Sequence, residues 1–448
     1  MEILEREVEI LDPQMPIVQK IGRHARICYK VEKEADFETD CRIIGKCIKD
    51  GHESILEHGI ISVFLQPQIT DDSKRISAVA GAKNPISLPL LWTIASTNAA
   101  KKFIEQVTDP DLYEHYKSRY SISGQERRLL PCLAGDVRAW RQAMRERIFM
   151  ASQNHNQAQY IFTLKIIHEL NKVDHGKVLF KDIYDDMNEI LKEEKIRETM
   201  LPKDLELKTW TVASIIDHYF KESNSVFADE GSPTLSLSVI LTTDRATTHQ
   251  LVRHRQEVAY SQESQRYVNY GKKGCCCVPM VIDPKKCPEG IKIDPFTGNL
   301  LEGQEAYDIW IKTIENCFQS YEKLLALGIP TESARGVLPN DAKTKIGVTW
   351  FRCPSYINLN FWRLEGHAQY AIRRLMYLVM FEMTRMHHPY SASIPHHLVI
   401  KWLEQMKEQK IIPEEEQIDK LIADRKKLQA AIAKMLQDAE APKKTEKK

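Results

Sequence analysis

The chain of 448 residues has almost no excess of either charge, because 63 lysines and arginines stand against 62 aspartates and glutamates. This balance argues against a nucleic acid or another polyanion as the partner, since proteins that bind polyanions usually carry a basic surplus. Any attraction for phosphate must therefore be local, in a cleft where arginines gather.

The sequence also lacks an apolar run long enough to cross a bilayer, and no segment reads as a signal peptide. Its ten cysteines include no C-x-x-C pair, and the three consecutive cysteines at 275–277 have the alternating faces of a buried strand. We therefore predict a cytoplasmic protein with no membrane partner, whose thiols are free. The histidine pairs 387–388 and 396–397 have no evident acidic or thiol partner, so no metal site is expected.

What the sequence does contain is a cationic cluster followed by a serine. Residues 253–255 read Arg-His-Arg, and after eight further residues the segment 264–267 reads Ser-Gln-Arg-Tyr. Guanidinium groups and a hydroxyl are donors suited to phosphate, and an imidazole can donate, accept or stack near neutral pH. A basic surface turn would explain an isolated Arg-His-Arg, but the longer pattern favours a site for a nucleotide monophosphate.

Three more segments occur around this one. Residues 52–58 read His-Glu-Ser-Ile-Leu-Glu-His, residues 334–339 read Ala-Arg-Gly-Val-Leu-Pro, and residues 363–369 read Arg-Leu-Glu-Gly-His-Ala-Gln. Together with 253–267, they resemble in kind and order the motifs of the flavin-dependent thymidylate synthases. The eight-residue spacer before Ser264 is one residue longer than is usual in that family, so it either forms a local bulge or moves Ser264 off the phosphate.

Each of these segments also has a purely structural interpretation. Ser54 and Glu57 have the spacing of a capping box at the start of a helix. Arg335 would serve equally well as a cap or ion-pair partner within a turn, and Arg363 as a polar residue on an amphipathic helix. The two histidines of segment 52–58 are six residues apart and do not have the His-Glu-x-x-His spacing of zinc hydrolases.

The resemblance implies an enzyme that methylates dUMP at C5, with 5,10-methylenetetrahydrofolate as the one-carbon donor and NADPH reducing the FAD that supplies hydride. In such enzymes the flavin carries the hard chemistry, while the protein contributes binding, orientation and electrostatics. The residues that the resemblance assigns to dUMP are Gln250, Arg253, Ser264, Arg266, Arg335 and Arg363. Arg363 would also be catalytic, because a fixed cation beside the uracil stabilises developing negative charge. The residues that it assigns to FAD are His52, Ser54, Glu57, Arg253, His254, Arg255, Gln262, Asn358 and His367.

Two other functions remain compatible with these residues. One is flavin-dependent transfer of a one-carbon group to another pyrimidine nucleotide, which the longer spacer and an altered segment before Arg363 permit. Of the family's Asn-x-Arg and later Asn in that segment, residues 349–358 retain only Asn358. The other is a paralogue that binds a nucleotide without catalysis.

The implied fold class is α+β, a mixed or antiparallel sheet flanked by long helices. Residues 59–65 and 234–243 have the character of strands, and residues 304–327 and 363–386 have the period of long helices. Because the family needs little more than half of this length, we predict a discontinuous catalytic core. It comprises residues 1–67 and 232–400 and is interrupted by an insertion over 68–231.

The insertion is predicted to be mainly helical, with helices over 137–169 and 179–195. Asp136 and Arg138 either begin the first of these helices or replace the missing Asn-x-Arg. The charged extension over 401–448 is predicted to contain an amphipathic helix that docks on the protein's own oligomer, followed by a disordered tail. The resemblance implies a homotetramer whose sites are shared among subunits.

Overall fold

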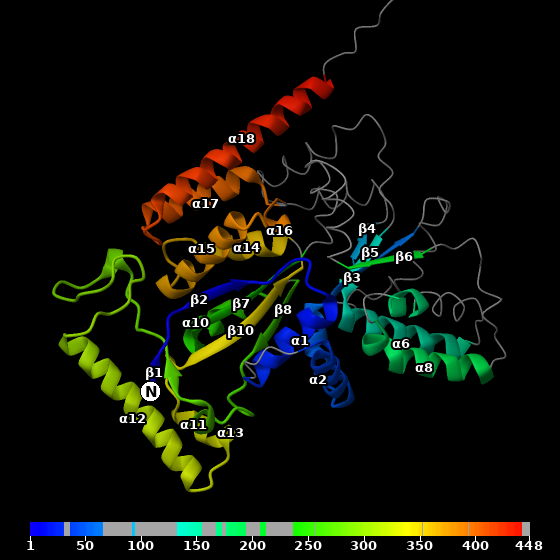
Figure 1. The fold of residues 1–448 in the computed structure, drawn as a ribbon, viewed down its shortest axis with the longest axis horizontal. Helices are drawn as coiled ribbons and strands as arrows, with labels where there is room; N and C mark the ends of the chain where they lie inside the picture. The colour runs from blue at the N-terminus through cyan, green and yellow to red at the C-terminus, as the bar shows by residue number, and fades with distance from the viewer. Residues whose placement is uncertain are drawn as a thin grey trace, which may run out of the picture.

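The computed structural model shows an α+β fold in which an antiparallel sheet lies between layers of helices (Figure 1). The fold class predicted from the sequence is therefore confirmed. The structure describes residues 1–30, 36–65, 92–94, 132–154, 167–172, 176–193, 207–211, 236–255, 257–351, 353–392 and 394–440. Within these residues, no helix is long and apolar enough to span a membrane.

The central sheet has four strands in the order β2-β7-β10-β8, and every neighbouring pair is antiparallel. The strands are β2 (Glu7–Ile10), β7 (Leu237–Asp244), β10 (Lys343–Trp350) and β8 (Val258–Gln262). The strand predicted over 234–243 is confirmed as β7. The sheet thus joins the N-terminus of the chain to segments more than two hundred residues away.

Strand β7 shows why its sequence alternates. Leu237, Val239 and Leu241 join the large core cluster that includes the C-terminal helices, whereas Ile240 packs with Leu11 and Ile27 on the other face. All eight residues of β7 are buried, so helices cover both faces of the sheet. Burial of such side chains contributes about 1.5 to 3 kcal/mol each, which makes this strand the centre of the fold.

The helices on the first face are α14 (Cys353–Arg363), α15 (Tyr370–Arg385), α16 (Pro389–Ala392) and α17 (His396–Glu408). The single helix predicted over 363–386 is wrong at its start, because Arg363 is the last residue of α14 and residues 364–369 form a loop before α15. Gly366 lies in this loop, and glycine disfavours a continuous helix by about 1 kcal/mol relative to alanine. The break gives His367 a loop position.

The second face of the sheet is covered by α1 (Ile17–Cys28), next to α2 (Phe37–Lys49) and the 3-10 helix η1 (Glu53–His58). His24 and His58 stack with their ring centroids 3.6 Å apart, and both are fully buried. The two ring nitrogens of His58 lie 2.8 Å from Thr349 Oγ1 and 2.9 Å from Ser261 Oγ. A Cβ atom at Gly347 would lie 2.0 Å from His24 Nδ1, so only glycine allows this approach.

A second antiparallel sheet, in the order β4-β5-β3-β6, combines one predicted strand with three from the insertion. Its strands are β3 (Ile60–Leu65), β4 (Trp92–Ile94), β5 (Cys132–Asp136) and β6 (Leu207–Thr211). The strand predicted over 59–65 is confirmed as β3, but it pairs with β5 and β6 rather than with the central sheet. The three strands of the insertion were not predicted.

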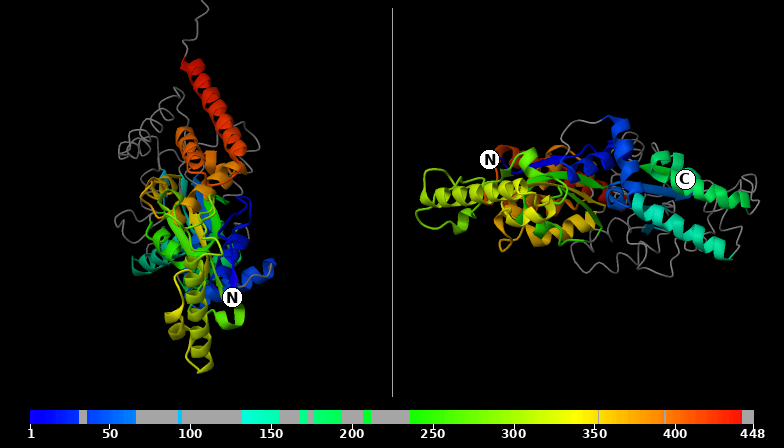
Figure 2. Two further views of the ribbon diagram at one scale, coloured as in Figure 1. Left: turned by 90° about the vertical axis from the view of Figure 1, so that its left-hand side faces the viewer. Right: turned by 90° about the horizontal axis from the view of Figure 1, so that it is seen from below.

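The helices predicted in the insertion are found as α6 (Val137–Asn154) and α8 (Gly176–Glu193). A further helical turn lies at 167–172, and residues 155–166, 194 and 195 of the predicted helices lie outside the described residues. The division of the chain into a split core, an insertion and an extension stays a prediction. Figure 2 places α6 and α8 at the end of the molecule opposite to α12.

The predicted helix 304–327 is confirmed as α12 (Glu305–Ala326), which ends just before Gly328 with a φ of 86°. Near α12 lie α11 (Tyr270–Lys273), α13 (Thr331–Ala334) and the 3-10 helix η6 (Arg335–Val337). The short strands β1 (Glu2–Ile3) and β9 (Cys276–Cys277) pair in parallel, which confirms the buried cysteine strand. The 3-10 helix η5 covers Pro284–Lys286. The eight cysteines whose side chains are described are free, as predicted.

The C-terminal extension forms α18 (Glu415–Glu440). Ile418 and Leu421 of the predicted apolar face, together with Ile422, are buried in the core cluster of the same chain, against α17, and docking of α18 on an oligomer stays a prediction. Arg425, the polar position that interrupts the apolar stripe, is buried as well and donates to the carbonyl oxygen of Ser391 at 3.2 Å. The tail 441–448, predicted to be disordered, lies outside the described residues.

Candidate functional site

The Arg-His-Arg segment follows a short capped helix, α10 (Arg245–Leu251). Asp244 caps this helix by accepting a hydrogen bond from the backbone N–H of Thr247 at 2.6 Å. The same carboxylate accepts from Arg6 Nη2 at 2.7 Å, and both side chains are buried. The end of β7 and the start of α10 are therefore firmly held, and residues 253–255 leave from the far end of the helix.

Five of the eight residues between Arg255 and Ser264 belong to strand β8. Glu257 has a φ of 54°, in the left-handed region that residues other than glycine rarely adopt. From Val258 onward, β8 pairs regularly with β10 as far as Gln262. The pairing of β8 contains no bulge, and Ser264 follows a strand whose register is unbroken.

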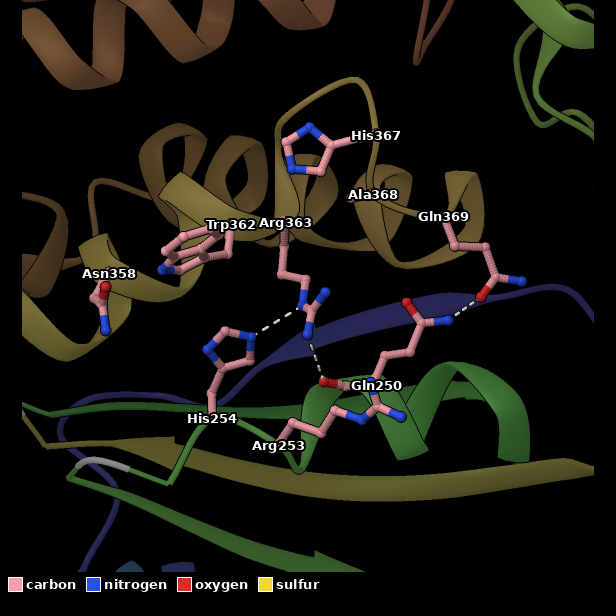
Figure 3. A pocket seen from close by; sticks show the side chains of 9 residues that line it. All are labelled: Gln250, Arg253, His254, Asn358, Trp362, Arg363, His367, Ala368 and Gln369. Carbon is pink, nitrogen blue, oxygen red and sulfur yellow. Dashed lines mark hydrogen bonds between the residues drawn. The ribbon is translucent and has the colours of Figure 1, made fainter.

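A cavity of about 500 Å³ opens between the turn after α10 and the end of α14 (Figure 3). Among the described residues, its lining carries two arginines, two histidines and three side-chain amides, and no aspartate or glutamate. The lining residues are Gln250, Arg253, His254, Asn358, Trp362, Arg363, His367, Ala368 and Gln369. Six of them were predicted from the sequence, and they come from two segments, 250–254 and 358–367, that lie about a hundred residues apart. Such a lining suits an anion with a planar polar ring.

Arg363 is the centre of this cavity. Its Nε donates to His254 Nε2 at 2.9 Å, and its Nη2 donates to the carbonyl oxygen of Gln250 at 3.2 Å. Burial and the charge of Arg363 lower the pKa of His254 to about 4, so this imidazole is neutral near pH 7. Because Nε2 accepts from a guanidinium, the proton of neutral His254 must reside on Nδ1.

The side-chain amides complete the rim of the cavity. The Nε2 atom of Gln250 donates to Oε1 of Gln369, which joins α10 to the residue before α15 (Figure 3). The carbonyl oxygen of His254 accepts from Tyr260 Oη at 2.7 Å, so the turn is also fixed to β8. The cavity is therefore held from three sides before any ligand binds, which favours specific binding.

Trp362, Ala368 and Gln369 were not predicted as site residues. Trp362 fits the apolar stripe of an amphipathic helix, but its side chain is 59% exposed and lies on the cavity wall. A local sequence pattern does not distinguish a tryptophan that packs in the core from one that lines a site. The signal that was available is its position directly before Arg363.

The other residues predicted to bind dUMP lie together outside the cavity. Ser264 Oγ accepts from the backbone N–H groups of Arg266 and Tyr267 at 3.2 and 3.3 Å. The guanidinium of Arg266 pairs with Glu332 at 3.0 Å, and Nε of Arg335 donates to the carbonyl oxygen of Glu332 at 3.1 Å. These three predicted residues form one cluster beside α13, but none of them lines the cavity.

The residues predicted for FAD are also divided. His52 and Ser54 are exposed at the start of η1, and Glu57 pairs with Arg138 of α6. The Nε2 atom of Gln262 donates to Thr248 Oγ1 at 2.8 Å, within the sheet region. Among the predicted FAD residues, those that line the cavity are Arg253, His254, Asn358 and His367, while Arg255 is exposed outside it.

Of the two helix starts expected from the sequence, the one at α6 has a side-chain cap and the one at η1 does not. The capping box expected of Ser54 and Glu57 is not formed, because η1 is a 3-10 helix whose N-cap residue, His52, makes no side-chain cap bond. Asp136 does cap α6, accepting from the backbone N–H of Ala139 at 2.8 Å. Burial raises the pKa of this carboxyl to about 7. Asp136 is thus a helix cap.

The paired histidines of the C-terminal region take structural roles. His388 is buried and its Nδ1 accepts from the backbone N–H of Tyr390 at 3.1 Å. His396 is buried beside Arg425, with 3.3 Å between Nδ1 and the guanidinium. Within the part of the chain that the structure describes, no three His, Cys, Asp or Glu side chains are grouped as metal ligands would be.

Known proteins resemble the region that builds this cavity. The family model described as thymidylate synthase complementing protein matches residues 234–390. A flavin-dependent thymidylate synthase of Geobacter sulfurreducens is 31% identical over 37% of this chain and 61% of its own length. Its counterpart in Pyrococcus furiosus is 33% identical over 32% of this chain and 51% of its own length. The one in Sulfurisphaera tokodaii is 31% identical over 41% of this chain and 60% of its own length.

The chain thus spans between half and about three fifths of the length of these curated relatives. A solved UMP/dUMP methylase from Streptomyces cacaoi is 19% identical over 39% of this chain and 70% of that one, with a TM-score of 0.29. A structural similarity this low does not establish a shared fold. The match to the family model contains the cavity residues of both motifs. By this match, residues 234–390 of the chain are similar to the flavin-dependent thymidylate synthase family.

Proposed function

We propose that this protein converts dUMP to dTMP, with FAD as cofactor, 5,10-methylenetetrahydrofolate as one-carbon donor and NADPH as reductant. The observation that carries the proposal is the cavity, in which the Arg-His-Arg segment meets the Arg-x(3)-His-Ala-Gln segment around Arg363. The names of the relatives support the same reaction, since they are flavin-dependent thymidylate synthases. The cytoplasm is the proposed location.

In this function Arg363 binds and polarises the uracil ring. Its guanidinium is already oriented by His254 and by the backbone of Gln250, so little reorganisation is needed when negative charge develops on the ring. Arg363 remains a cation even though burial and the nearby charge of Arg253 lower its pKa. Neutral His254 leaves its Nδ1–H as a donor for a ring carbonyl.

The residues present fit a flavin. Exposed His52 before η1 and exposed Ser54 within it, together with His254, Asn358 and His367 in the cavity, offer donors and acceptors of the kind that the isoalloxazine ring and the phosphates of FAD require. When bound, the flavin would supply the hydride for the reduction. The protein's own task is to hold the two planar groups and to keep water from them.

The division of the predicted dUMP residues supports a homo-oligomer with shared sites. Arg363 lines the cavity, whereas Arg335 and Arg266 lie in the cluster beside α13. A second copy that brings its cluster to this cavity would supply the phosphate donors that the cavity lacks. We propose the homotetramer implied by the resemblance, in which every site uses residues of more than one subunit.

The experiment that tests the function uses purified protein. We expect a flavin absorbance spectrum after addition of FAD, NADPH oxidation that depends on dUMP and methylenetetrahydrofolate, and dTMP as the product. Bound flavin with a different methylated pyrimidine nucleotide would show another acceptor. Nucleotide binding without flavin binding or turnover would show a non-catalytic paralogue, and either result would refute the proposal.

Replacement of Trp362 by alanine is expected to weaken dUMP binding about tenfold. A base that stacks on an aromatic side chain gains about 1 to 3 kcal/mol, and Trp362 presents an exposed indole on the cavity wall. Equilibrium dialysis with dUMP measures the change. Trp362→Phe keeps an aromatic ring and should retain most of the affinity. Equal dUMP affinity in the alanine variant and the wild type would rule out stacking.

A further inference from the structure

The 3-10 helix η1 is attached to the insertion by a network of charges. Glu53 Oε1 lies 3.0 Å from Arg141 Nη2 and 2.8 Å from Arg145 Nη2. Both arginines belong to α6, and both also contact Asp182 of α8, at 2.6 and 3.3 Å. The positive charges of two arginines are thus neutralised by two carboxylates where η1, α6 and α8 meet.

Arg141 is the buried centre of this network. Its side chain is fully buried, and it donates through Nη1 and Nη2 to both oxygens of Asp182 at 2.8 and 2.6 Å. Burial tends to raise the pKa of Glu53, but hydrogen bonds from Arg145 and the charge of Arg141 hold it below its usual range. Glu53 is therefore ionised at neutral pH and bonded on both sides. Bidentate arginine pairs of this kind fix geometry as well as charge.

The other end of η1 is fixed to α6 as well. Glu57 forms an ion pair with Arg138, and the backbone N–H of Val137 donates to the carbonyl oxygen of Gly59 at 2.8 Å. Trp140 Nε1 donates to the carbonyl oxygen of Ile61 at 3.0 Å, and its side chain is buried. The first turn of α6 thus holds both the end of η1 and the start of β3.

A six-residue 3-10 helix needs such support. Its hydrogen bonds have poor geometry, and the N-terminus of η1 has no side-chain cap. The buried side chains of Ile55, Leu56 and His58 fix one face of η1. Glu53 lies at the start of η1 and Glu57 near its end. The contacts with α6 and α8 restrain these ends.

We propose that α6 and α8 of the insertion form a brace that positions η1 for the cofactor, with Arg141, Arg145 and Arg138 as positioning residues. This inference rests on the proposed function, in which His52, Ser54 and Glu57 of this segment contact FAD. Arg145 acts only through Glu53 and Asp182, neither of which is assigned to a ligand. The brace affects cofactor binding by ordering η1 before the cofactor arrives.

The test compares full-length Arg145→Gln with Arg145→Lys and with Lys181→Ala. Lys181 is an exposed residue of α8 that pairs only with Asp185 among its described contacts, so its variant is the matched control. Hydrogen exchange of the backbone amides of residues 53–58 measures order in η1. FAD and dUMP affinities are measured separately, by flavin fluorescence and by equilibrium dialysis. Arg145 is 45% exposed, so its loss should have a moderate effect.

We expect Arg145→Gln to accelerate exchange in residues 53–58 and to weaken FAD binding about fivefold, with dUMP affinity unchanged. Arg145→Lys should recover part of the FAD affinity, and Lys181→Ala should behave as the wild type. Unchanged FAD affinity in Arg145→Gln, or an equal loss of FAD and dUMP affinity, would overturn the brace. Absence of FAD binding in the wild type would overturn the proposed function instead, and the positioning role with it.

Discussion

Arg363→Ala is expected to lower the rate of dTMP formation by about 10²- to 10³-fold, which is the usual cost of removing a fixed donor that stabilises developing charge. The guanidinium has two described protein partners, His254 Nε2 and the carbonyl oxygen of Gln250, and none of the described residues that line the cavity is acidic. Its charge is therefore available to a ligand. Steady-state dTMP formation measures the loss, and thermal unfolding checks that the fold is retained.

Two further variants make the result specific to the geometry of the guanidinium. Arg363→Lys keeps the charge but has no planar fork, so it should recover only a small part of the activity. Arg385→Ala removes an exposed arginine of α15 that pairs with Glu382 and should leave the activity unchanged. Full activity in Arg363→Ala would show that the uracil is polarised elsewhere.

The same variant tests whether sites are shared between subunits. Arg363→Ala and Arg335→Ala should each be inactive as pure oligomers, because each lacks one half of the proposed dUMP site. Co-expression of the two should restore about a quarter of the wild-type activity, since random mixing rebuilds one intact site in half of the paired interfaces. No recovery in mixed oligomers would mean that each site is built within one chain.

The second large effect is expected in the dependence of stability on pH. Burial and the charge of Lys20 lower the pKa of His58 to about 3, and burial and the neighbouring His58 lower that of His24 well below its ordinary value. An unfolded histidine titrates near pH 6.5, so below this pH the unfolded chain binds more protons than the folded one. The contribution of these two neutral histidines to the free energy of unfolding is therefore fully present above about pH 6.5. It falls with decreasing pH, by about 1.4 kcal/mol per pH unit for each histidine.

Denaturant unfolding between pH 4 and pH 8 measures this dependence. His24→Leu removes one titrating ring and retains a similar volume against Gly347. The unfolded chain should then take up about one proton fewer relative to the folded chain at acid pH, so the free energy of unfolding should fall less steeply as the pH decreases. Neither ring nitrogen of His24 has a hydrogen-bond partner among the described residues, so the variant leaves no described polar group newly unpaired. His249→Leu, at an exposed position of α10, is the control and should keep the wild-type slope. Equal slopes for His24→Leu and the wild type would contradict the prediction.

The cavity could be predicted from the sequence because its residues have short and specific spacings. Arg253, His254, Arg363 and His367 were each named from a motif, and the structure brings them together. Trp362 was missed because an apolar residue on a helix has the same pattern whether it faces the core or a cavity. The break of the helix after Arg363 was missed for a related reason, since Gly366 alone does not distinguish a loop from a tolerated glycine.

The insertion was harder to predict than the core. Its helices α6 and α8 have a clear helical period, and both were expected. Its strands β5 and β6 are short and pair with β3, a segment from another part of the sequence. Sheet pairing depends on such distant partners, which a local pattern does not contain. The network around Glu53 was missed for the same reason.

The place of β3 also has a consequence for how the chain folds during synthesis. Its two neighbours come from different parts of the predicted insertion, β5 at 132–136 and β6 at 207–211. Because the ribosome releases the chain from its N-terminus onward, one edge of β3 stays unpaired until residue 211 has emerged. An unpaired edge invites pairing with another chain. Ribosome-bound chains that stop before β6 should therefore be the ones that recruit chaperones and aggregate.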